Sequence, residues 1–321
     1  MMDIIARAAH RASAKGGLPI YSAILVRQGD VVASDGVTTV IQRCAALKKF
    51  TFAVDAMRFL AAVRATDGKP KLNITDGGKL TVSRGKFRAI LPLMDEENYP
   101  VPCTVADGTP LPGNFLSQLA LIAPFIARDK ARPWAMSVKI DAAAMYAANG
   151  VVLVRAEFDG WAGRDVVLPL AAVEALLGAK IAPNTLALTD HSASFRYDDM
   201  VLVTALLSHK WPDIARLLSD VGEQLPVPDG LADAIERVKP FCPTSTLAII
   251  SLTADGRVCT ADGDISSSQD GFTFTQDTAF DAGWLLSVLA VANTIDLTKY
   301  PAVVPFVGAG IRGVLAGVKR G

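Results

Sequence analysis

FAVDAMRFLAAVRA, residues Phe52 to Ala65, decides the fold of this chain of 321 residues. The stretch begins extended and then takes the apolar spacing of a short amphipathic helix. Two later stretches have the same order, LPLAAVEALLGAK from Leu168 and FDAGWLLSVLAVAN from Phe280. Their starts are 116 and 112 residues apart (168 − 52 and 280 − 168). A constant spacing of this kind indicates an internal repeat.

A second helix recurs with the same rhythm. DIIARAAHRASAK starts at Asp3, NFLSQLALIAPFIARDK at Asn114 and GLADAIERVKPFC at Gly230. Asn114 is a suitable N-cap for its helix. The stretches between helices read as hairpins, because ITDGGKL, TADGRV and AANGVV carry the Asp-Gly or Asn-Gly turns that hairpins prefer. Each third of the chain therefore reads helix, strands, helix, strands.

Pro- and Gly-rich segments separate the three repeats. PVPCTVADGTPLPG and GEQLPVPDG fall between them and are typical of linkers. We therefore predict an α+β protein of three repeated domains, 1–104, 105–225 and 226–321. In each domain two helices pack on antiparallel sheets.

The charge of the chain is zero overall but uneven along its length. Residues 1–105 hold 15 Lys/Arg and 9 Asp/Glu, residues 106–225 hold 10 and 13, and residues 226–321 hold 7 and 10. The basic first third indicates a surface that meets an anion, of which nucleic acid is one candidate.

Cysteine usage and hydropathy point to a soluble protein of the cytoplasm. The four cysteines, at 44, 103, 242 and 259, form no C-x-x-C pair, so we expect buried free thiols and neither zinc nor disulfides. The N-terminus lacks the uninterrupted apolar core of a secretory signal. WLLSVLAVANTI, from Trp284, is too short to span a membrane.

FVGAGIRG, residues 306–313, has the G-x-G-x-x-G spacing of a dinucleotide-binding turn. That motif needs a following helix and a second strand with an acidic residue. Only eight residues follow Gly313, so there is no room for either. We predict a glycine-rich turn in a final hairpin, and no cofactor.

Catalytic groups do not converge in the sequence. His10, His191 and His209 are its histidines, and His191 lies between Asp190 and Ser192. Neighbouring residues on a strand point to opposite faces, so these three form no triad. Asp95, Glu96 and Glu97 have no second cluster at ligand spacing, which favours a solvated loop over a metal site. We therefore expect a protein that is not an enzyme.

Several stretches together resemble the bacterial DNA sliding clamp, the beta subunit of the replicative DNA polymerase. LPIYSAILVRQGDVVASDGVTTVIQRC, from Leu18, is similar to the opening of that family. KLTVSRGKFRAILPLMDEENYP, from Lys79, is similar to its strand, turn, second strand ending Leu-Pro, and acidic stretch closed by Pro. LLSHKWPDIARLLS, from Leu206, resembles its run into the last linker, and GVLAGVKRG its C-terminal peptide-binding strand.

The chain also departs from the family pattern. Where the family has Thr-Asp-Gly-His-Arg-Leu, we align EFDGWAGRDV, in which Asp159 and Gly160 fit and Trp161 replaces His. Gly317 stands where Pro is usual, and Ala316 and Val318 stand where Met is usual. The family's first strand before the first helix is missing or trimmed. These departures imply a divergent clamp, of bacterial or phage origin.

The resemblance implies a processivity factor with half a ring per chain. Two chains would join head to tail, sheet edge to sheet edge, between domain 1 of one and domain 3 of the other. The ring would encircle double-stranded DNA without reading its sequence, through Lys and Arg on the inner helices. Candidates for these contacts are Arg7, Arg11, Lys15, Arg58, Arg64, Arg128, Lys130, Arg132, Lys180, Arg237 and Lys239.

The resemblance also implies that DNA polymerase and clamp loader dock a short peptide in a cleft between domains 2 and 3. Its walls by position are Phe158, Gly160, Trp161, Pro212, Leu217, Val314, Leu315 and Val318, with Arg216 as a polar rim. Beside an Asp-Gly turn, Trp161 is expected to be partly exposed. Two alternatives stay open. The basic residues can be ordinary solvated helix faces, and the chain can be a clamp-like scaffold or inhibitor that binds replication proteins without encircling DNA.

Overall fold

The computed structural model describes residues 1–12, 18–75, 77–102, 108–158, 161, 163–214, 216–243, 247–268 and 272–318. Within these residues it holds six α-helices and three antiparallel sheets, so the predicted α+β class is confirmed. Contacts divide the chain into two compact units. Unit 1 is Met1–Gly113 with Ala171–Leu207, and unit 2 is Asn114–Leu170 with Ser208–Gly321.

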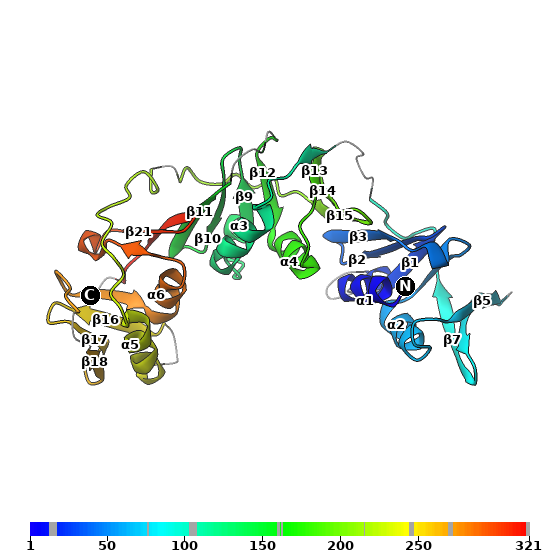
Figure 1. Ribbon diagram of the computed structural model, residues 1–321, viewed down its shortest axis with the longest axis horizontal. Helices are drawn as coiled ribbons and strands as arrows, with labels where there is room; N and C mark the ends of the chain where they lie inside the picture. Colours follow the sequence, from blue (N-terminus) through cyan, green and yellow to red (C-terminus); the bar gives the residue numbers. More distant parts are fainter. Residues whose placement is uncertain are drawn as a thin grey trace. The chain divides into compact units, whose positions relative to one another are not determined.

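Unit 1 is built on one antiparallel sheet. Among the described residues its strand order is β5-β6-β7-β4-β1-β2-β3-β15-β14-β13-β8. Helices α1 and α2 pack against each other, and α1 also contacts β2 and β3 (Figure 1). The strands are β1 Ala23–Arg27, β2 Asp30–Ser34, β3 Thr38–Arg43, β4 Thr51–Asp55, β5 Lys71–Thr75, β6 Lys79–Arg84, β7 Phe87–Met94, β8 Thr109–Pro110, β13 Thr185–Leu188, β14 Ser192–Arg196 and β15 Met200–Ala205; the helices are α1 Met2–Arg11, α2 Ala56–Arg64 and, apart from its first residue, α4 Leu170–Ala179.

Unit 2 contains two antiparallel sheets in its described part. One has the order β12-β9-β10-β11-β22-β21-β20 and the other the order β18-β17-β16-β19. Helix α3 contacts β10 and β11, whereas α5 contacts β17 and β18 (Figure 1). The strands are β9 Ser137–Ile140, β10 Ala144–Ala148, β11 Val152–Glu157, β12 Val166–Pro169, β16 Ile249–Thr253, β17 Arg257–Thr260, β18 Ser266–Ser268, β19 Thr278–Asp281, β20 Thr294–Ile295, β21 Val304–Gly308 and β22 Ile311–Leu315; the helices are α3 Phe115–Ile122, α5 Leu231–Val238 and α6 Ala282–Leu289.

The repeat predicted from the sequence is present in the structure. β4 runs directly into α2, β12 into α4 and β19 into α6, at the three stretches that begin at Phe52, Leu168 and Phe280. The second helix of each repeat is also present, as α1, α3 and α5.

Sheets join neighbouring repeats. β3 pairs with β15, with Val40 opposite Leu202, and β11 pairs with β22, with Leu153 opposite Val314. The middle third therefore contributes α3 and β9–β12 to unit 2, and β13–β15 with most of α4 to unit 1. The compact units do not coincide with the three domains expected from the sequence, and the boundaries near residues 104 and 226 stay predictions.

Two helices end earlier than the sequence pattern predicts. α3 stops at Ile122 and continues as a 3₁₀ turn, Ala123–Phe125; α5 stops at Val238 and continues as Lys239–Phe241. Each turn contains a proline, Pro124 or Pro240. Proline has no N–H for the helical hydrogen bond and crowds the preceding turn, so it ends the α-helix.

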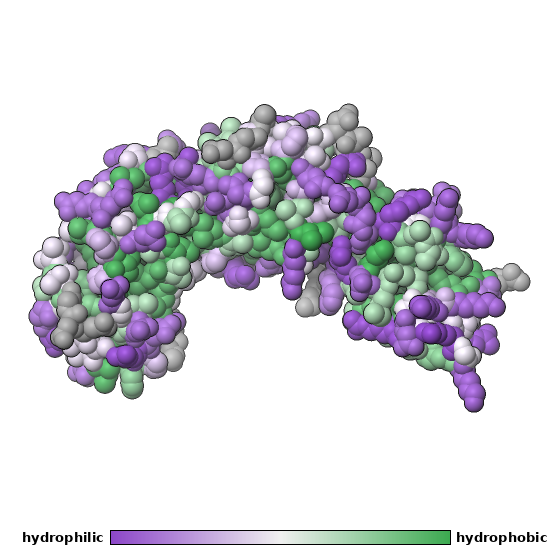
Figure 2. Space-filling model, in the orientation of Figure 1, coloured by the Kyte–Doolittle hydropathy of each residue, from purple (hydrophilic) through white to green (hydrophobic). Residues whose placement is uncertain are grey.

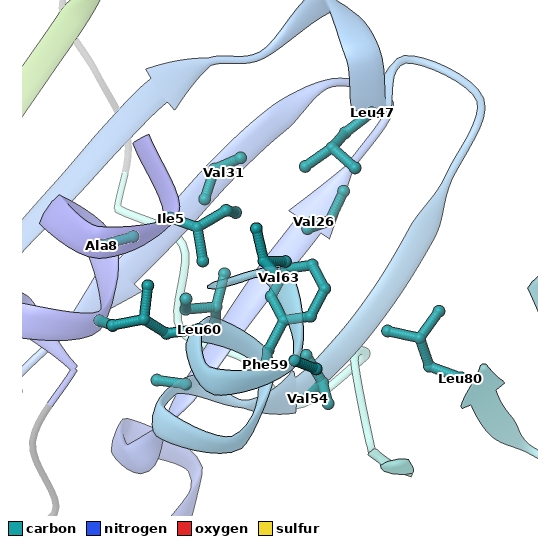
Figure 3. Close-up of a cluster of buried hydrophobic side chains, with 14 of the residues drawn as sticks. Ile5, Ala8, Val26, Val31, Leu47, Val54, Phe59, Leu60, Val63 and Leu80 are labelled. Carbon is teal, nitrogen blue, oxygen red and sulfur yellow. The ribbon is translucent and has the colours of Figure 1, made fainter. Parts of the chain in front are cut away.

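Helices α1 and α2 of unit 1 cover an apolar core (Figure 3). Ile5 and Ala8 of α1 meet Phe59, Leu60 and Val63 of α2 over one face of the sheet. The rings of Phe52 and Phe59 meet edge to face, with centroids 5.7 Å apart. Burying side chains of this size contributes ~1.5–3 kcal/mol each.

The G-x-G-x-x-G stretch forms the hairpin predicted for it. β21 and β22 pair from Val304–Leu315 to Gly308–Ile311, and Ala309 and Gly310 make the turn. Gly308 lies against backbone, since a Cβ there would stand 1.8 Å from the carbonyl oxygen of Val291. Packing of the hairpin therefore accounts for this glycine without a phosphate ligand.

Two carboxylates cap helices in the same way in the two units. Asp55 Oδ1 accepts a hydrogen bond from the Arg58 N–H (2.8 Å), and Asp281 Oδ1 accepts one from the Trp284 N–H (2.9 Å). Each satisfies an N–H that the helix leaves without a partner, which is worth ~1 kcal/mol.

Asp281→Ala is expected to destabilise unit 2 by ~1 kcal/mol, because it removes this cap. All four tryptophans, at 134, 161, 211 and 284, lie in unit 2, so their fluorescence in urea reports its unfolding. Asp55→Ala is the matched variant in unit 1. An unchanged urea midpoint for Asp281→Ala would contradict the prediction, and an equal shift for both variants would mean that the units unfold together.

In the part of the chain that the structure describes, no helix is long and apolar enough to cross a membrane. Cys44, Cys242 and Cys259 are buried free thiols, as expected, and burial raises the pKa of the Cys242 thiol. Cys103 lies outside the described residues.

Candidate functional site

An apolar cavity of about 270 Å³ opens within unit 2 beside β11 and β22. Most of its lining comes from three segments: the β10–β11 turn with the start of β11, the segment that follows Trp211, and the end of β22. Trp134 and Val303 complete it. The lining residues that matter below are Trp134, Gly150, Pro212, Leu217, Val303 and Val314.

The β10–β11 turn owes its shape to Asn149 and Gly150. The Asn149 Oδ1 accepts hydrogen bonds from the N–H groups of Val151 (2.9 Å) and Val152 (2.8 Å). Gly150 has φ +89°, a conformation that a residue with a Cβ rarely adopts. The turn therefore brings bare backbone to the wall of the cavity.

Trp134 and Trp211 hold in place the segment that follows Trp211. The ring of Trp211 meets that of Trp134 edge to face at 5.2 Å, and its Nε1–H donates to Ser137 Oγ (3.1 Å). Ile214 and Leu218 are buried in the same cluster. Trp134 and Ile214 of this cluster line the cavity together with Pro212 and Leu217, and Leu217 remains 45% exposed. An exposed leucine above an apolar hollow is typical of a surface that receives an apolar ligand group.

The structure brings together some residues of the predicted cleft. Pro212, Leu217 and Val314 line the cavity, and Arg216 is exposed next to Leu217 in the chain. Leu315 follows Val314 on β22 but is fully buried, because successive side chains of a strand alternate between faces. Val318 is half-buried, and its N–H donates to the Ala279 carbonyl (2.8 Å), so its backbone extends the β19 edge.

Phe158 and Trp161 do not line the cavity, and the expected exposure of Trp161 is wrong. Their rings stack at 6.4 Å, and Phe158 meets Phe115 of α3 edge to face at 6.3 Å. Both side chains are buried, because an aromatic ring gains more from packing under α3 than from solvent contact. Gly160 lies outside the described residues.

The turn at the cavity is Asn149–Gly150, one hairpin before the Asp-Gly pair aligned with the family motif. The sequence does indicate a turn at Asn149–Gly150, since AANGVV has the Asn-Gly pair that hairpins prefer. The sequence comparison aligns the family motif with Asp159–Gly160 and does not assign Asn149–Gly150 to the cleft. The pairing of β11 with β22 decides which turn meets Val314.

Some of the basic residues predicted to contact DNA instead form contacts with other residues of their own unit. Arg11 forms an ion pair with Asp35 (2.8 Å), and Arg7 is half-buried with Nη1 3.6 Å from the sulfur of Met200. The Arg132 guanidinium donates to the Asn149 carbonyl (3.1 Å) and lies across Gly150, where a Cβ would approach it to 1.5 Å. Arg132 therefore supports the turn at the cavity.

The remaining basic residues do not recur on both helices of every repeat. The sequences of α3, α4 and α6 hold no Lys or Arg. Arg128 and Lys130 follow the 3₁₀ turn after α3, because Pro124 ends the helix first. The exposed members of the set are Arg58, Arg64, Arg128, Lys130, Arg132, Lys180, Arg237 and Lys239, and Lys15 lies outside the described residues.

No group of three or more His, Cys, Asp or Glu in the described residues has the geometry of a metal site. The acidic stretch after β7 is a loop in which Asp95 Oδ1 accepts from the Glu97 N–H (3.0 Å). The residues that line the cavity are mostly apolar, with Asp213 as the one carboxylate among the described lining residues.

The fold of the whole chain is similar to solved bacterial sliding clamps. The DNA polymerase sliding clamp of Bacillus subtilis matches with a TM-score of 0.85 at 13% identity, over 100% of this chain and 97% of that one. The polymerase III beta subunit of Caulobacter crescentus matches at 0.84 with 17% identity, over 99% and 97%. The sliding clamp of Pseudomonas aeruginosa, solved bound to griselimycin, matches at 0.82 with 15% identity, over 100% and 97%.

No family model and no curated protein sequence matches the chain. At identities of 13–17% the likeness establishes the fold. The chain has the α+β fold of the bacterial DNA polymerase III beta sliding clamp, in strongly divergent sequence.

Proposed function

We propose that this chain is a DNA sliding clamp without catalytic activity of its own. Two copies close into a ring around duplex DNA, and the ring tethers a polymerase that docks a short peptide in the apolar cavity of unit 2. The observation that carries the proposal is the cavity itself: in a chain with the clamp fold over its full length, Pro212, Leu217 and Val314 meet at one apolar hollow.

The cavity fits an extended peptide with apolar side chains. Its walls include Trp134, Leu217, Val303 and Val314, and the turn at Gly150, which Arg132 supports, closes one side. Arg216 is exposed next to Leu217 and serves as a polar rim. Grooves of this kind bind by apolar anchors and take their orientation from a few polar groups.

DNA contacts come from the exposed basic residues at helix ends and turns. Arg58 and Arg64 on α2, and Arg237 and Lys239 at the end of α5, are the strongest candidates because they are exposed and each pair shares one segment. Phosphate contacts are blind to sequence and weaken with salt. A small number of phosphate contacts in each copy keeps the binding weak, which allows a ring to slide along DNA.

The alternative is a clamp-like scaffold that binds replication proteins without encircling DNA. The lack of Lys and Arg on α3, α4 and α6 favours it, as do the internal contacts of Arg7, Arg11 and Arg132. A scaffold keeps the peptide cavity and needs no ring.

Retention on DNA separates the two functions. The native protein is expected to stay on nicked circular plasmid through gel filtration, and to be lost when the plasmid is cut once, because a ring slides off an end. Arg58→Ala/Arg64→Ala is expected to lower the salt slope of DNA binding by up to roughly two phosphate contacts. Equal retention on circular and linear plasmid, or none on either, would contradict the clamp and favour the scaffold.

A further inference from the structure

A second cavity, in unit 1, has the same construction as the cavity in unit 2. Its volume is also about 270 Å³, and strands β3 and β15, which pair with each other, line part of it. The corresponding pair in unit 2 is β11 and β22. The lining residues used below are Tyr21, Gly36, Val37, Pro100 and Val101.

The β2–β3 turn at this cavity repeats the β10–β11 turn of unit 2. The Asp35 Oδ1 accepts hydrogen bonds from the N–H groups of Val37 (2.9 Å) and Thr38 (2.7 Å), as the Asn149 Oδ1 does from the two corresponding groups in unit 2. Gly36 has φ +89°, the same value as the glycine that follows Asn149. An Asx-Gly pair therefore shapes one side of both cavities.

A buried aromatic residue followed by a cavity-lining proline occurs in both units, as Tyr99–Pro100 and as Trp211–Pro212. The tyrosine hydroxyl donates to the carbonyl oxygen of Ala23 (3.1 Å), where β1 begins. The tryptophan Nε1–H donates to Ser137 Oγ (3.1 Å), where β9 begins. Each hydrogen bond ties the segment to a strand and leaves the proline at the cavity.

Apolar side chains reach the surface at the unit 1 cavity. Single exposed apolar residues are ordinary, and Figure 2 shows apolar residues among hydrophilic ones on the visible face of both units. Val37 and Val101 differ because both line one cavity, together with the ring of Tyr21, and they are 42% and 41% exposed. Exposed valines at an aromatic-lined hollow are typical of a surface that receives an apolar side chain.

Acidic side chains flank the unit 1 cavity. Residues 95–97, which read Asp-Glu-Glu, come shortly before Tyr99–Pro100. In the described part of the chain none of the three forms a salt bridge. One positive charge lies near them, since Arg27 Nη2 donates to the Glu96 carbonyl (3.4 Å). Three acids and one arginine give this flank a net charge of −2.

The flank of the unit 2 cavity has the opposite sign. Lys210 precedes Trp211–Pro212, and Asp213 and Arg216 follow it. Two cations and one carboxylate give a net charge of +1. The two cavities therefore share their construction and differ in the charge beside them.

We propose that the unit 1 cavity is a second docking site, which takes an extended peptide of a partner protein with an apolar anchor side chain and Lys or Arg next to it. The construction shared with the unit 2 cavity indicates an extended peptide, and the acidic flank selects a basic one. One chain can then hold two partners that carry different peptides. The inference rests on the proposed function for the kind of ligand that such a cavity binds.

Peptide selection is the first test. A phage-displayed library of random dodecapeptides is panned on the native protein, and the selected peptides are labelled for fluorescence anisotropy with native protein, Val101→Lys and Leu217→Asp. One class, rich in Lys and Arg, should bind Val101→Lys at least roughly tenfold more weakly, because the variant loses an apolar contact and adds a like charge. The same class should bind Leu217→Asp as it binds the native protein.

Ile181→Lys is the matched control for Val101→Lys. Ile181 is 44% exposed, belongs to unit 1 and does not line the cavity, and the variant gains the same charge. Every selected peptide should bind it with native affinity. Circular dichroism of each variant checks that its fold is intact.

Removal of the flanking charge is the second test. Glu96→Gln/Glu97→Gln should weaken binding of the basic class roughly fivefold at low salt, and should leave the peptides that depend on Leu217 unchanged. Asp229→Asn/Asp233→Asn, which changes two exposed carboxylates of unit 2, is the control with the same change of net charge.

The outcomes separate this inference from the proposed function. The proposal is overturned if Val101→Lys and Ile181→Lys bind all selected peptides alike, or if the peptides lost with Val101→Lys are not enriched in Lys and Arg. Neither result touches the unit 2 site, which stands where Leu217→Asp loses a class of its own. If the basic class depends on Val101 but no peptide depends on Leu217, the second site stands and docking in unit 2 fails.

Discussion

Gly308→Ala is expected to destabilise unit 2 by about 3 kcal/mol, the upper part of the usual range for overpacking. The new methyl group would lie 1.8 Å from the carbonyl oxygen of Val291 and 3.1 Å from a methyl group of Ile311. The first of these is backbone and cannot turn aside, so β21 must shift away from the segment after α6. Tryptophan fluorescence in urea measures the loss, since all four tryptophans belong to unit 2.

The comparison variant is Gly178→Ala in α4, which lies in unit 1, so its stability is followed by circular dichroism in urea and not by tryptophan fluorescence. A Cβ there meets nothing within 4 Å, and alanine favours a helix over glycine by up to ~1 kcal/mol. This variant should be neutral or stabilising. If Gly308→Ala unfolds at the native urea concentration, the close approach of the β21–β22 hairpin to Val291 is wrong.

Leu217→Asp is expected to weaken binding of a polymerase-derived peptide roughly a hundredfold. It removes an apolar wall and places a carboxylate where a bound peptide would exclude water, which together cost ~3 kcal/mol. Leu217 is 45% exposed in the free protein, so the variant should fold normally. Fluorescence anisotropy of the labelled peptide measures affinity, and the urea midpoint checks the fold.

Leu247→Asp is the matched control for this cavity. Leu247 is 47% exposed, lies in the same unit and does not line the cavity. Its peptide affinity should equal that of the native protein. Equal affinity of the Leu217 variant and the native protein would remove the cavity as the docking site. Trp161→Ala is unsuited to this purpose, because Trp161 packs against Phe158 and its loss would report stability.

The helices and most hairpins could be predicted from the sequence because their signals are local. The strand that runs into a helix at Phe52, Leu168 and Phe280 needs neighbours only a few residues apart. The predicted ends of α3 and α5 were less accurate, because Pro124 and Pro240 end these helices early. A stricter reading of those prolines would have placed Arg128 and Lys130 beyond α3.

The candidate site was found in part. Pro212, Leu217 and Val314 were identified through the family resemblance. Phe158 and Trp161 were also assigned to the cleft, although Phe158 packs on Phe115 of α3 and Trp161 stacks on Phe158. The error came from aligning the family motif with Asp159–Gly160, whereas Asn149–Gly150, an equally good Asx-Gly turn locally, is interpreted from the sequence only as a hairpin turn. Nothing within a few residues of Asn149 or Asp159 tells which turn lies beside a strand some 160 positions later.

By itself the sequence determined the repeated order of strand and helix, because apolar periodicity and turn residues act over one or two helical turns. Tertiary structure alone decided which turn and which strand share the cavity wall, and which arginines are held by Asp35 or Asn149. These features depend on pairing between β3 and β15 and between β11 and β22. Such pairings form when whole faces bury together, a sum over many residues that no short stretch encodes.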